Sequence, residues 1–214
     1  ELHDGSMRPG FDLAGVFVGS EGTFGIATQA TLRLIQRLPH VATLLAAFES
    51  IHDGSVAVSE IIASGILPAA LEMMDAVAIE AAEAAVHPNF PSADTILIVE
   101  LDGPSAEVAE LFAIVESTCR KSGATRVEIA QDEAQRSRIW KGRKAAFAAM
   151  GRISPNYYVQ DGVVPRTKLP EVLGRIRLLE KREGLRIGNV FHAGDGNLHP
   201  LICYDERIEG QSAL

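Results

Sequence analysis

The 214-residue chain is long enough for one sizeable hydrophobic core, and its 47% hydrophobic and 22% charged residues are typical of globular proteins. Its net charge of −8 argues against nucleic-acid binding, because neutralising phosphates requires clustered lysine and arginine. No apolar run reaches the roughly 18–20 residues of a membrane span, and we expect neither a span nor a secretory leader.

The first predicted elements are a glycine-rich loop and a strand. Gly19, Gly22 and Gly25 resemble a dinucleotide-binding fingerprint, but that fingerprint must open a helix. Here residues 28–34 follow, and their alternating hydropathy predicts a strand instead. The loop is therefore either a plain turn or a segment that lines a cofactor, whose close approach three missing Cβ atoms would allow.

Pro39 indicates a boundary, beyond which predicted helices and strands alternate with short connections. In chain order we predict a strand over 41–50, helices over 54–65 and 70–86, a strand over 94–103, a helix over 105–123 with Ser105 as N-cap, a strand over 124–130, a helix over 132–151, a strand over 156–165, a helix over 168–184, and two strands around a turn over 186–205. This order predicts an α+β fold in which helices cover an antiparallel sheet, because the final strand–turn–strand argues against an all-parallel sheet.

The two cysteines do not form a metal-type pair. Cys119 lies in a helical pattern and Cys203 in an apolar strand, so we expect two buried thiols. Free buried thiols are typical of a reducing compartment, and we expect the protein to be cytoplasmic.

The segment GNVFHAGDGNLHP, residues 188–200, carries two histidines around an Asp-Gly pair. Asp195-Gly196 between apolar runs is a strong signal for a two-residue hairpin turn. Such a turn would pair Gly194 with Asn197, Ala193 with Leu198 and His192 with His199. Directly opposed residues have Cβ atoms about 4.5–5.5 Å apart, so the two imidazoles would meet.

Two meeting imidazoles could bind one divalent ion, and Asn197 would present its amide on the same face as His199. The alternative is a tight hairpin whose histidines form only local hydrogen bonds. Two ligands make half of a tetrahedral site, and no nearby acid stands out as a third. Glu72 and Asp161 are acids to which the pattern assigns no role.

Several segments then resemble one family in sequence order: FDLAGVFVGSEGTFGIATQATLRL, ALEMMD, AQDEAQRSRIWKGRKAAF, GRISPNYYVQDGVVPR and NVFHAGDGNLHPLI. They are similar to the FAD-linked 2-hydroxy-acid dehydrogenases of the vanillyl-alcohol oxidase type, over practically the whole chain. The resemblance implies the tail of a flavin-binding domain over residues 1–38. Over 39–214 it implies a ferredoxin-like cap domain that binds substrate.

The resemblance also implies roles for individual residues. His192 and His199 would bind a divalent metal, Zn²⁺ or Mn²⁺, and Arg143 would anchor the substrate carboxylate. Lys141 and Lys144 compete for that anchoring role, and a solvated basic helix face is the alternative without the family. Asn197 would face the flavin or the substrate. The implied flavin-lining residues are Gly19, Ser20, Glu21, Gly22, Thr23, Gly25, Ile26 and Asn197.

The implied reaction is oxidation of a small 2-hydroxy acid, glycolate or D-lactate, with hydride transfer to FAD. The family's pocket lysine is not reproduced at Val159 and Gln160, which favours a monocarboxylate. Trp140, Tyr157 and Tyr158 line the pocket or, as is more common for aromatics, belong to the core.

The resemblance places the main FAD pyrophosphate segment before Glu1, and a Glu-His pair with the third metal ligand after Leu214. We therefore expect no turnover by this stretch alone. The glycolate-oxidising branch is the most similar, which implies a second flavin-type subunit and an iron–sulfur subunit as partners, and a peripheral place at the inner membrane face. We also expect self-association. A non-catalytic α+β interaction module and a simple metal-binding protein remain the alternatives.

Overall fold

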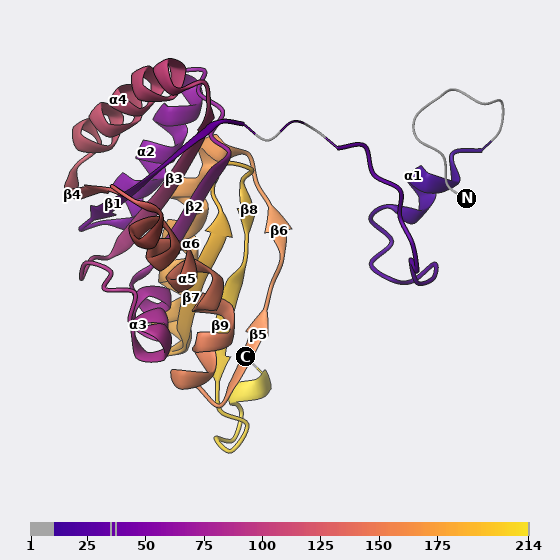
Figure 1. The fold of residues 1–214 in the computed structure, drawn as a ribbon. Helices are drawn as coiled ribbons and strands as arrows, with labels where there is room; N and C mark the ends of the chain where they lie inside the picture. Colours follow the sequence, from indigo (N-terminus) through magenta and orange to yellow (C-terminus); the bar gives the residue numbers. More distant parts are fainter. Residues whose placement is uncertain (1–10, 35, 37, 214) are drawn as a thin grey trace. The chain divides into compact units, whose positions relative to one another are not determined.

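The structure, a computed structural model, describes residues 11–34, 36 and 38–213. The chain divides into two compact units, one before residue 38 and one from Leu38 onward. The first unit contains the short helix α1 (Leu13–Phe17). The second contains the remaining helices and strands (Figure 1).

The second unit alternates strands and helices from end to end. Its elements in chain order are β1 (His40–Phe48), α2 (Ile51–Ala63), β2 (Ala70–Asp75), α3 (Ala76–Val86), β3 (Thr95–Gly103), α4 (Ser105–Lys121), β4 (Ala124–Ile129), α5 (Glu133–Ala149), η1 (Met150–Arg152), β5 (Asn156–Val159), β6 (Gly162–Val163), η2 (Arg166–Lys168), α6 (Leu169–Glu183), β7 (Arg186–His192), β8 (Asn197–Leu198), β9 (Pro200–Tyr204) and η3 (Gln211–Ala213).

The strands form one sheet in the order β4-β1-β3-β2-β7-β8-β6, and β9 pairs with both β5 and β7. Figure 1 shows β4 at one edge and β6 at the other. Every pairing among the described strands is antiparallel. The predicted α+β fold, an antiparallel sheet covered by helices, is therefore confirmed.

Helices cover both faces of the sheet because the central strands are apolar on both sides. On β1, Leu44 and Phe48 belong to a core shared with α2, α4 and α6. Leu45 and Ala47, one residue out of phase, belong to a second core shared with α3 and α5. Strand residues alternate between faces, so each strand residue near the histidine pair can be assigned to one face of the sheet.

The prediction of a helix over 70–86 is wrong for its first six residues, which form β2. This strand lies between β3 and β7 and is buried on both faces, so its apolar pattern shows no period of two. The helix begins only after Asp75, whose carboxylate accepts a hydrogen bond from the backbone N–H of Ala78 at 3.0 Å.

The predicted strand over 28–34 is not formed, and the described residues before 38 contain no strand with which it could pair. Leu32 and Leu34 are accordingly 77% and 90% exposed. The glycine loop is a turn in which Gly19, Gly22 and Gly25 all have positive φ, at 82°, 81° and 144°. Alternation predicts a strand only where a partner strand is available.

Smaller differences concern element ends. Helix α2 begins at Ile51 rather than Gly54, because the Ser50 hydroxyl accepts hydrogen bonds from two backbone N–H groups of its first turn. Helix α4 begins at Ser105 itself, so Ser105 is not the N-cap. The predicted strand over 156–165 is divided into β5 and β6, and the final segment forms three strands rather than two.

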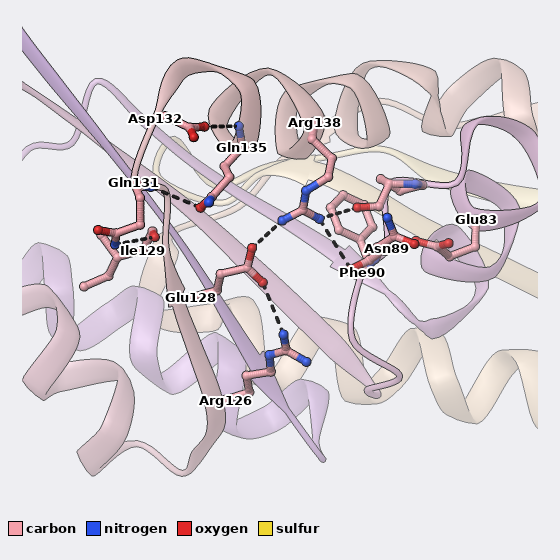
Figure 2. A network of polar contacts seen from close by, with 11 residues as sticks. Glu83, Asn89, Phe90, Arg126, Glu128, Ile129, Gln131, Asp132, Gln135 and Arg138 are labelled. Carbon is pink, nitrogen blue, oxygen red and sulfur yellow. Dashed lines mark hydrogen bonds and ion pairs between the residues drawn. The ribbon is translucent and has the colours of Figure 1, made fainter.

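Helix α5 is fixed in position by a polar network at its N-terminal half (Figure 2). The Arg138 guanidinium is paired with Glu128 of the edge strand β4 and donates to the backbone carbonyls of Pro88 and Asn89. One turn further along, Gly142 lies directly against Phe90 and Pro88. The network matters for the site because α5 also carries Arg143.

Candidate functional site

The turn between β7 and β8 contains four residues, 193–196, rather than the predicted two. The N–H of Asp195 donates to the carbonyl of His192 at 3.1 Å, and His192 pairs with Asn197. The predicted pairing of His192 with His199, and of Gly194 and Ala193 with Asn197 and Leu198, is therefore wrong. The longer turn is stabilised by hydrogen bonds to segments outside the hairpin.

Two neighbouring segments hold this turn. The N–H of Gly194 donates to the carbonyl of Leu71 in β2 at 3.0 Å, and the carbonyl of Gly196 accepts from the N–H of Val164 at 2.9 Å. A Cβ at Gly196 would lie 2.1 Å from the Val164 carbonyl oxygen, and its φ is +71°. Glycine is thus required at this position for both space and backbone conformation.

The two imidazoles nevertheless meet, by a diagonal route. The same register pairs Asn189 with Pro200, so it continues with His199 opposite Val190, two residues before His192. A shift of two residues keeps a side chain on the same face of a sheet. The ring centroids of His192 and His199 lie 5.6 Å apart, with the rings edge to face at 86°.

Each histidine has a carboxylate at its Nδ1 atom. Glu72 Oε1 lies 2.9 Å from Nδ1 of His192, and Asp161 Oδ1 lies 3.5 Å from Nδ1 of His199. Both Nε2 atoms are the ring nitrogens not occupied by these carboxylates. Histidines that bind metals commonly direct their second nitrogen to a carboxylate in this way.

Both carboxylates are acids to which the sequence assigned no role, and their contacts with the histidines were not predicted. Glu72 was hidden by the incorrect helix over 70–86. Assigned to a strand, it would have been an acid between Leu71 and Met73 in a buried segment, and such a charge requires a partner. Asp161 lies in the short break between β5 and β6, and no local pattern indicates which side chain it faces.

Arg143 lies beside the histidine pair but binds Glu72. Its Nε and Nη2 donate to Glu72 Oε2 at 3.0 and 2.7 Å, and both side chains are 8% exposed. The ring of Phe147 packs against the guanidinium and, edge to face, against His199. The predicted anchor thus lies within the candidate site, although an acid of the protein already engages its charge.

Lys141 and Lys144 face a different region. Both are exposed, and they line an open depression of about 800 Å³ together with Glu100 and Trp140. Both acids that line it already have partners. Glu100 accepts hydrogen bonds from Thr43, Arg136 and Trp140, and Glu133 accepts from Arg136 and Ser137. The depression contains neither histidine, so neither lysine is placed to replace Arg143.

Burial lowers the pKa of His199 below its ordinary value, against the opposing effect of Asp161. A lowered pKa keeps this imidazole neutral near pH 7, the form in which histidine binds metals. Asn197, opposite His192, has a buried Oδ1 without a hydrogen-bond partner among the described residues.

The family model of the C-terminal domain of FAD linked oxidases matches residues 37–214. The chain belongs to this family. The resemblance on which the sequence-based predictions rest is thereby confirmed, and residues 38–213 show the structure of an FAD linked oxidase C-terminal domain.

The curated relatives agree with the family. The chain is 50% identical over 98% of its length to the "Glycolate oxidase subunit GlcD" of Escherichia coli (strain K12), of which it covers 42%. It is 32% identical over 92% of its length to the "Probable D-lactate dehydrogenase, mitochondrial" of Danio rerio, of which it covers 40%. The chain therefore spans about two fifths of the length of these relatives.

The fold occurs in solved structures that are more distant in sequence. An alkyldihydroxyacetonephosphate synthase structure matches 94% of this chain with a TM-score of 0.70 and 17% identity, and the match covers 44% of that protein. At this identity the likeness concerns the fold alone. It supports the layered antiparallel architecture of the FAD linked oxidase C-terminal domain.

The remaining predicted site residues are the glycine loop and three aromatic side chains. The glycine loop, residues 19–26, belongs to the unit before residue 38, so its contact with a flavin stays a prediction. Trp140 and Tyr157 pack against the α3/α5 core, whereas Tyr158 is 59% exposed. Among the described residues, no group of three or more His, Cys, Asp or Glu side chains is arranged to hold a metal.

Proposed function

We propose that this chain forms the substrate-binding part of an FAD-linked enzyme that oxidises a small 2-hydroxy acid, glycolate or D-lactate, to the 2-oxo acid. The observation that carries the proposal is the pair of adjoining imidazoles whose Nδ1 atoms face carboxylates. The names of the curated relatives support the substrate class.

The donor set fits a divalent ion. Zn–N bonds of about 2.0–2.1 Å bring two coordinating nitrogens within about 4.2 Å of each other, which rings with centroids 5.6 Å apart allow. His192 and His199 would hold Zn²⁺ or Mn²⁺ through Nε2, and the buried Oδ1 of Asn197 offers a further acceptor beside them. A third strong ligand has to come from outside the described residues, where the family resemblance implies a Glu-His pair.

A bound divalent ion would polarise the substrate hydroxyl and lower its pKa, and bound FAD would accept the hydride. The chain's own residues orient the substrate. Arg143 has five N–H donors, so binding Glu72 leaves donors for a substrate carboxylate, and its predicted anchoring role is retained in the proposal. Asn197 and the loop over residues 19–26 are proposed to contact the flavin.

The partners belong to the same proposal. One relative is named a glycolate oxidase subunit, which supports the presence of partner subunits. From the family resemblance we propose that these are a second flavin-type subunit and an iron–sulfur subunit. None of the helices that the structure describes has the length and hydropathy to cross a membrane. We propose attachment at the inner membrane face through those partners.

Metal binding tests the proposed centre directly, in protein that also carries the downstream Glu-His pair implied by the family resemblance. Titration calorimetry with Zn²⁺ and with Mn²⁺ should show binding that His192→Ala and His199→Ala each abolish. His52→Ala, which removes an exposed histidine of α2, is the matched control and should bind as wild type does. Wild-type protein without metal affinity would favour the non-catalytic module.

A test of the proposed oxidation requires the protein with FAD bound. Anaerobic addition of glycolate or D-lactate should bleach the flavin absorption, and His192→Ala should prevent the bleaching. Flavin that stays oxidised with both acids would contradict the proposed reaction.

A further inference from the structure

We infer that Glu72 is a positioning residue that, held by Arg143, fixes the tautomer and orientation of His192. The relevance of this role to metal binding rests on the function proposed above. Glu72 and His192 are direct cross-strand partners in β2 and β7, which places their side chains on the same face of the sheet. Oε1 of Glu72 lies 2.9 Å from Nδ1 of His192.

The two oxygens of the Glu72 carboxylate have different partners: Oε2 binds the guanidinium of Arg143, and Oε1 faces the imidazole of His192. Nε and Nη2 of Arg143 both donate to Oε2, so Oε1 is left for the imidazole. An ion-paired carboxylate can only accept hydrogen bonds, and Nδ1 of His192 must therefore donate. A neutral imidazole carries one N–H, which leaves Nε2 of His192 unprotonated and available as a ligand.

The two histidines differ in how firmly their carboxylates hold them. Glu72 is 8% exposed, is paired with Arg143 and lies 2.9 Å from His192. Asp161 is 69% exposed and lies 3.5 Å from His199. Solvent screens and competes with the second contact far more than the first. The buried carboxylate of Glu72 thus fixes the orientation of the His192 ring, whereas the exposed carboxylate of Asp161 holds the His199 ring less firmly.

A purely structural role explains the pair poorly. Replacing a buried ion pair by apolar residues is often neutral or stabilising, so stability alone gives little reason for burying Glu72 and Arg143. The buried pair is instead aimed at His192, whose side chain is 49% exposed and accessible to a ligand. The arrangement matches the carboxylate–histidine contacts that set ligand orientation in metal sites.

The test uses long-range ¹H–¹⁵N spectra of histidine-labelled, metal-free full chain at about pH 8, where an ordinary imidazole is neutral. Wild-type His192 should carry its proton on Nδ1, which is the minor form in water. Glu72→Ala alone would leave Arg143 buried without a partner and endanger folding. The double variant Glu72→Leu, Arg143→Met removes both charges and should return His192 to the Nε2-protonated form.

Zn²⁺ affinity is the second measurement, made on protein that also carries the implied downstream Glu-His pair. The double variant should bind Zn²⁺ about 10–100-fold more weakly than wild type, the usual effect of losing such a partner. Glu116→Gln, the control at an ion-paired acid of α4 on the other face of the sheet, should keep both the His192 tautomer and the affinity close to wild type. An Nε2-protonated His192 in the wild type, or an unchanged dissociation constant in the double variant, would overturn the inference. An Nδ1-protonated His192 in a chain that binds no Zn²⁺ would support the positioning role and refute the metal centre.

Discussion

Two buried acids on β2, three residues apart, are stabilised in different ways. Glu72 is paired directly with an arginine, whereas Asp75 forms no ion pair with a described residue and accepts hydrogen bonds from the backbone of Ala78 and the amide of Asn189, with Arg177 acting on it only through its charge. Burial raises the pKa of Asp75 to about 6, although these bonds oppose the shift. The strand therefore contains one acid paired with an arginine and one whose pKa is raised by burial.

Asp75 predicts a pH-dependent contribution to stability. Its folded pKa lies above its ordinary value of 3.8, so the folded state binds the proton more tightly. Its contribution to the free energy of unfolding is complete below about pH 4 and is lost as the pH rises through about 6. Two pKa units correspond to about 3 kcal/mol. Asp75→Asn retains a capping side chain without this titration.

The measurement is the free energy of unfolding in urea, for wild type and variant, from about pH 4 to about pH 8. Stability of Asp75→Asn relative to wild type should rise by about 3 kcal/mol over this range. Asp102→Asn, at an exposed acid of β3, should leave the pH dependence of the wild type unchanged. A difference between wild type and Asp75→Asn that does not vary with pH would contradict the prediction.

Gly142 is predicted to be intolerant of a methyl group. A Cβ there would lie 2.4 Å from Cζ of Phe90 and 2.8 Å from Cβ of Pro88. Gly142→Ala should therefore lower the free energy of unfolding by about 1–3 kcal/mol, despite the better helix propensity of alanine. Gly174→Ala, in the exposed face of α6 with no atom near the added methyl, should instead be neutral or stabilise by up to about 1 kcal/mol. Denaturant midpoints distinguish the two.

At the scale of elements, α5 connects the edge strand to the site. Arg138 near its start joins Glu128 of β4 to the carbonyls after α3, and Arg143 near its middle joins Glu72 of β2 (Figure 2 shows the first of these networks). Any movement of α5 relative to the sheet would disturb both. Helix α5 is therefore bound both to the edge strand and to the acid beside the histidine pair.

Removing the Arg138–Glu128 ion pair should make strand β4 less stable. Arg138→Ala loses charge-assisted hydrogen bonds from a side chain that is 27% exposed, so we expect a loss of about 1–3 kcal/mol in unfolding free energy and faster amide hydrogen exchange in β4. Arg120→Ala breaks an exposed i,i+4 pair on α4 and should cost no more than about 0.5 kcal/mol. Equal effects of the two substitutions would show that the network does not hold the edge strand.

Most elements could be predicted from the sequence because their signals are local. Caps, glycine ends and hydrophobic periodicity located helices α4, α5 and α6 to within a few residues. The errors occur where partners decide the outcome. Residues 70–75 become a strand because β3 and β7 flank them, and residues 28–34 do not because the described residues offer no partner strand.

The candidate site could be predicted in part. The sequence indicated two histidines on one face, and the rings do meet, although the four-residue turn differs from the predicted one. The carboxylates could not be found, because Glu72 lies far from His192 in sequence and only the sheet order brings them together. Likewise, the contact of Arg143 with Glu72 depends on how α5 packs against β2, which no local pattern encodes.

At the scale of the whole molecule, the described residues before 38 expose large apolar side chains. Ile26 is 89% exposed, Leu32 77% and Leu34 90%. Exposed apolar surface of this kind favours association. We predict that the average mass of the chain in sedimentation velocity rises with concentration, and that the double variant Leu32→Ser, Leu34→Ser reduces this rise.

A matched substitution tests whether any exposed leucine would behave in the same way. Leu178→Ser, on α6 and 67% exposed in the wild type, should leave association unchanged. A chain that stays monomeric at every concentration would show that the exposed apolar residues before 38 do not associate.

The site residues lie far apart in the sequence, so the ribosome synthesises them at different times. His192 follows Glu72 by 120 residues, and Arg143 follows it by 71. At about 5–20 residues per second, the ribosome delivers the histidine roughly 6–24 seconds after the glutamate. Arg143 is synthesised within that interval, so Glu72 first gains its ion-pair partner and only later its hydrogen-bond partner His192. In the proposed function, an ion bound by the two histidines would therefore bind only after His199 has been synthesised, when strands β1 to β7 are already present in the chain.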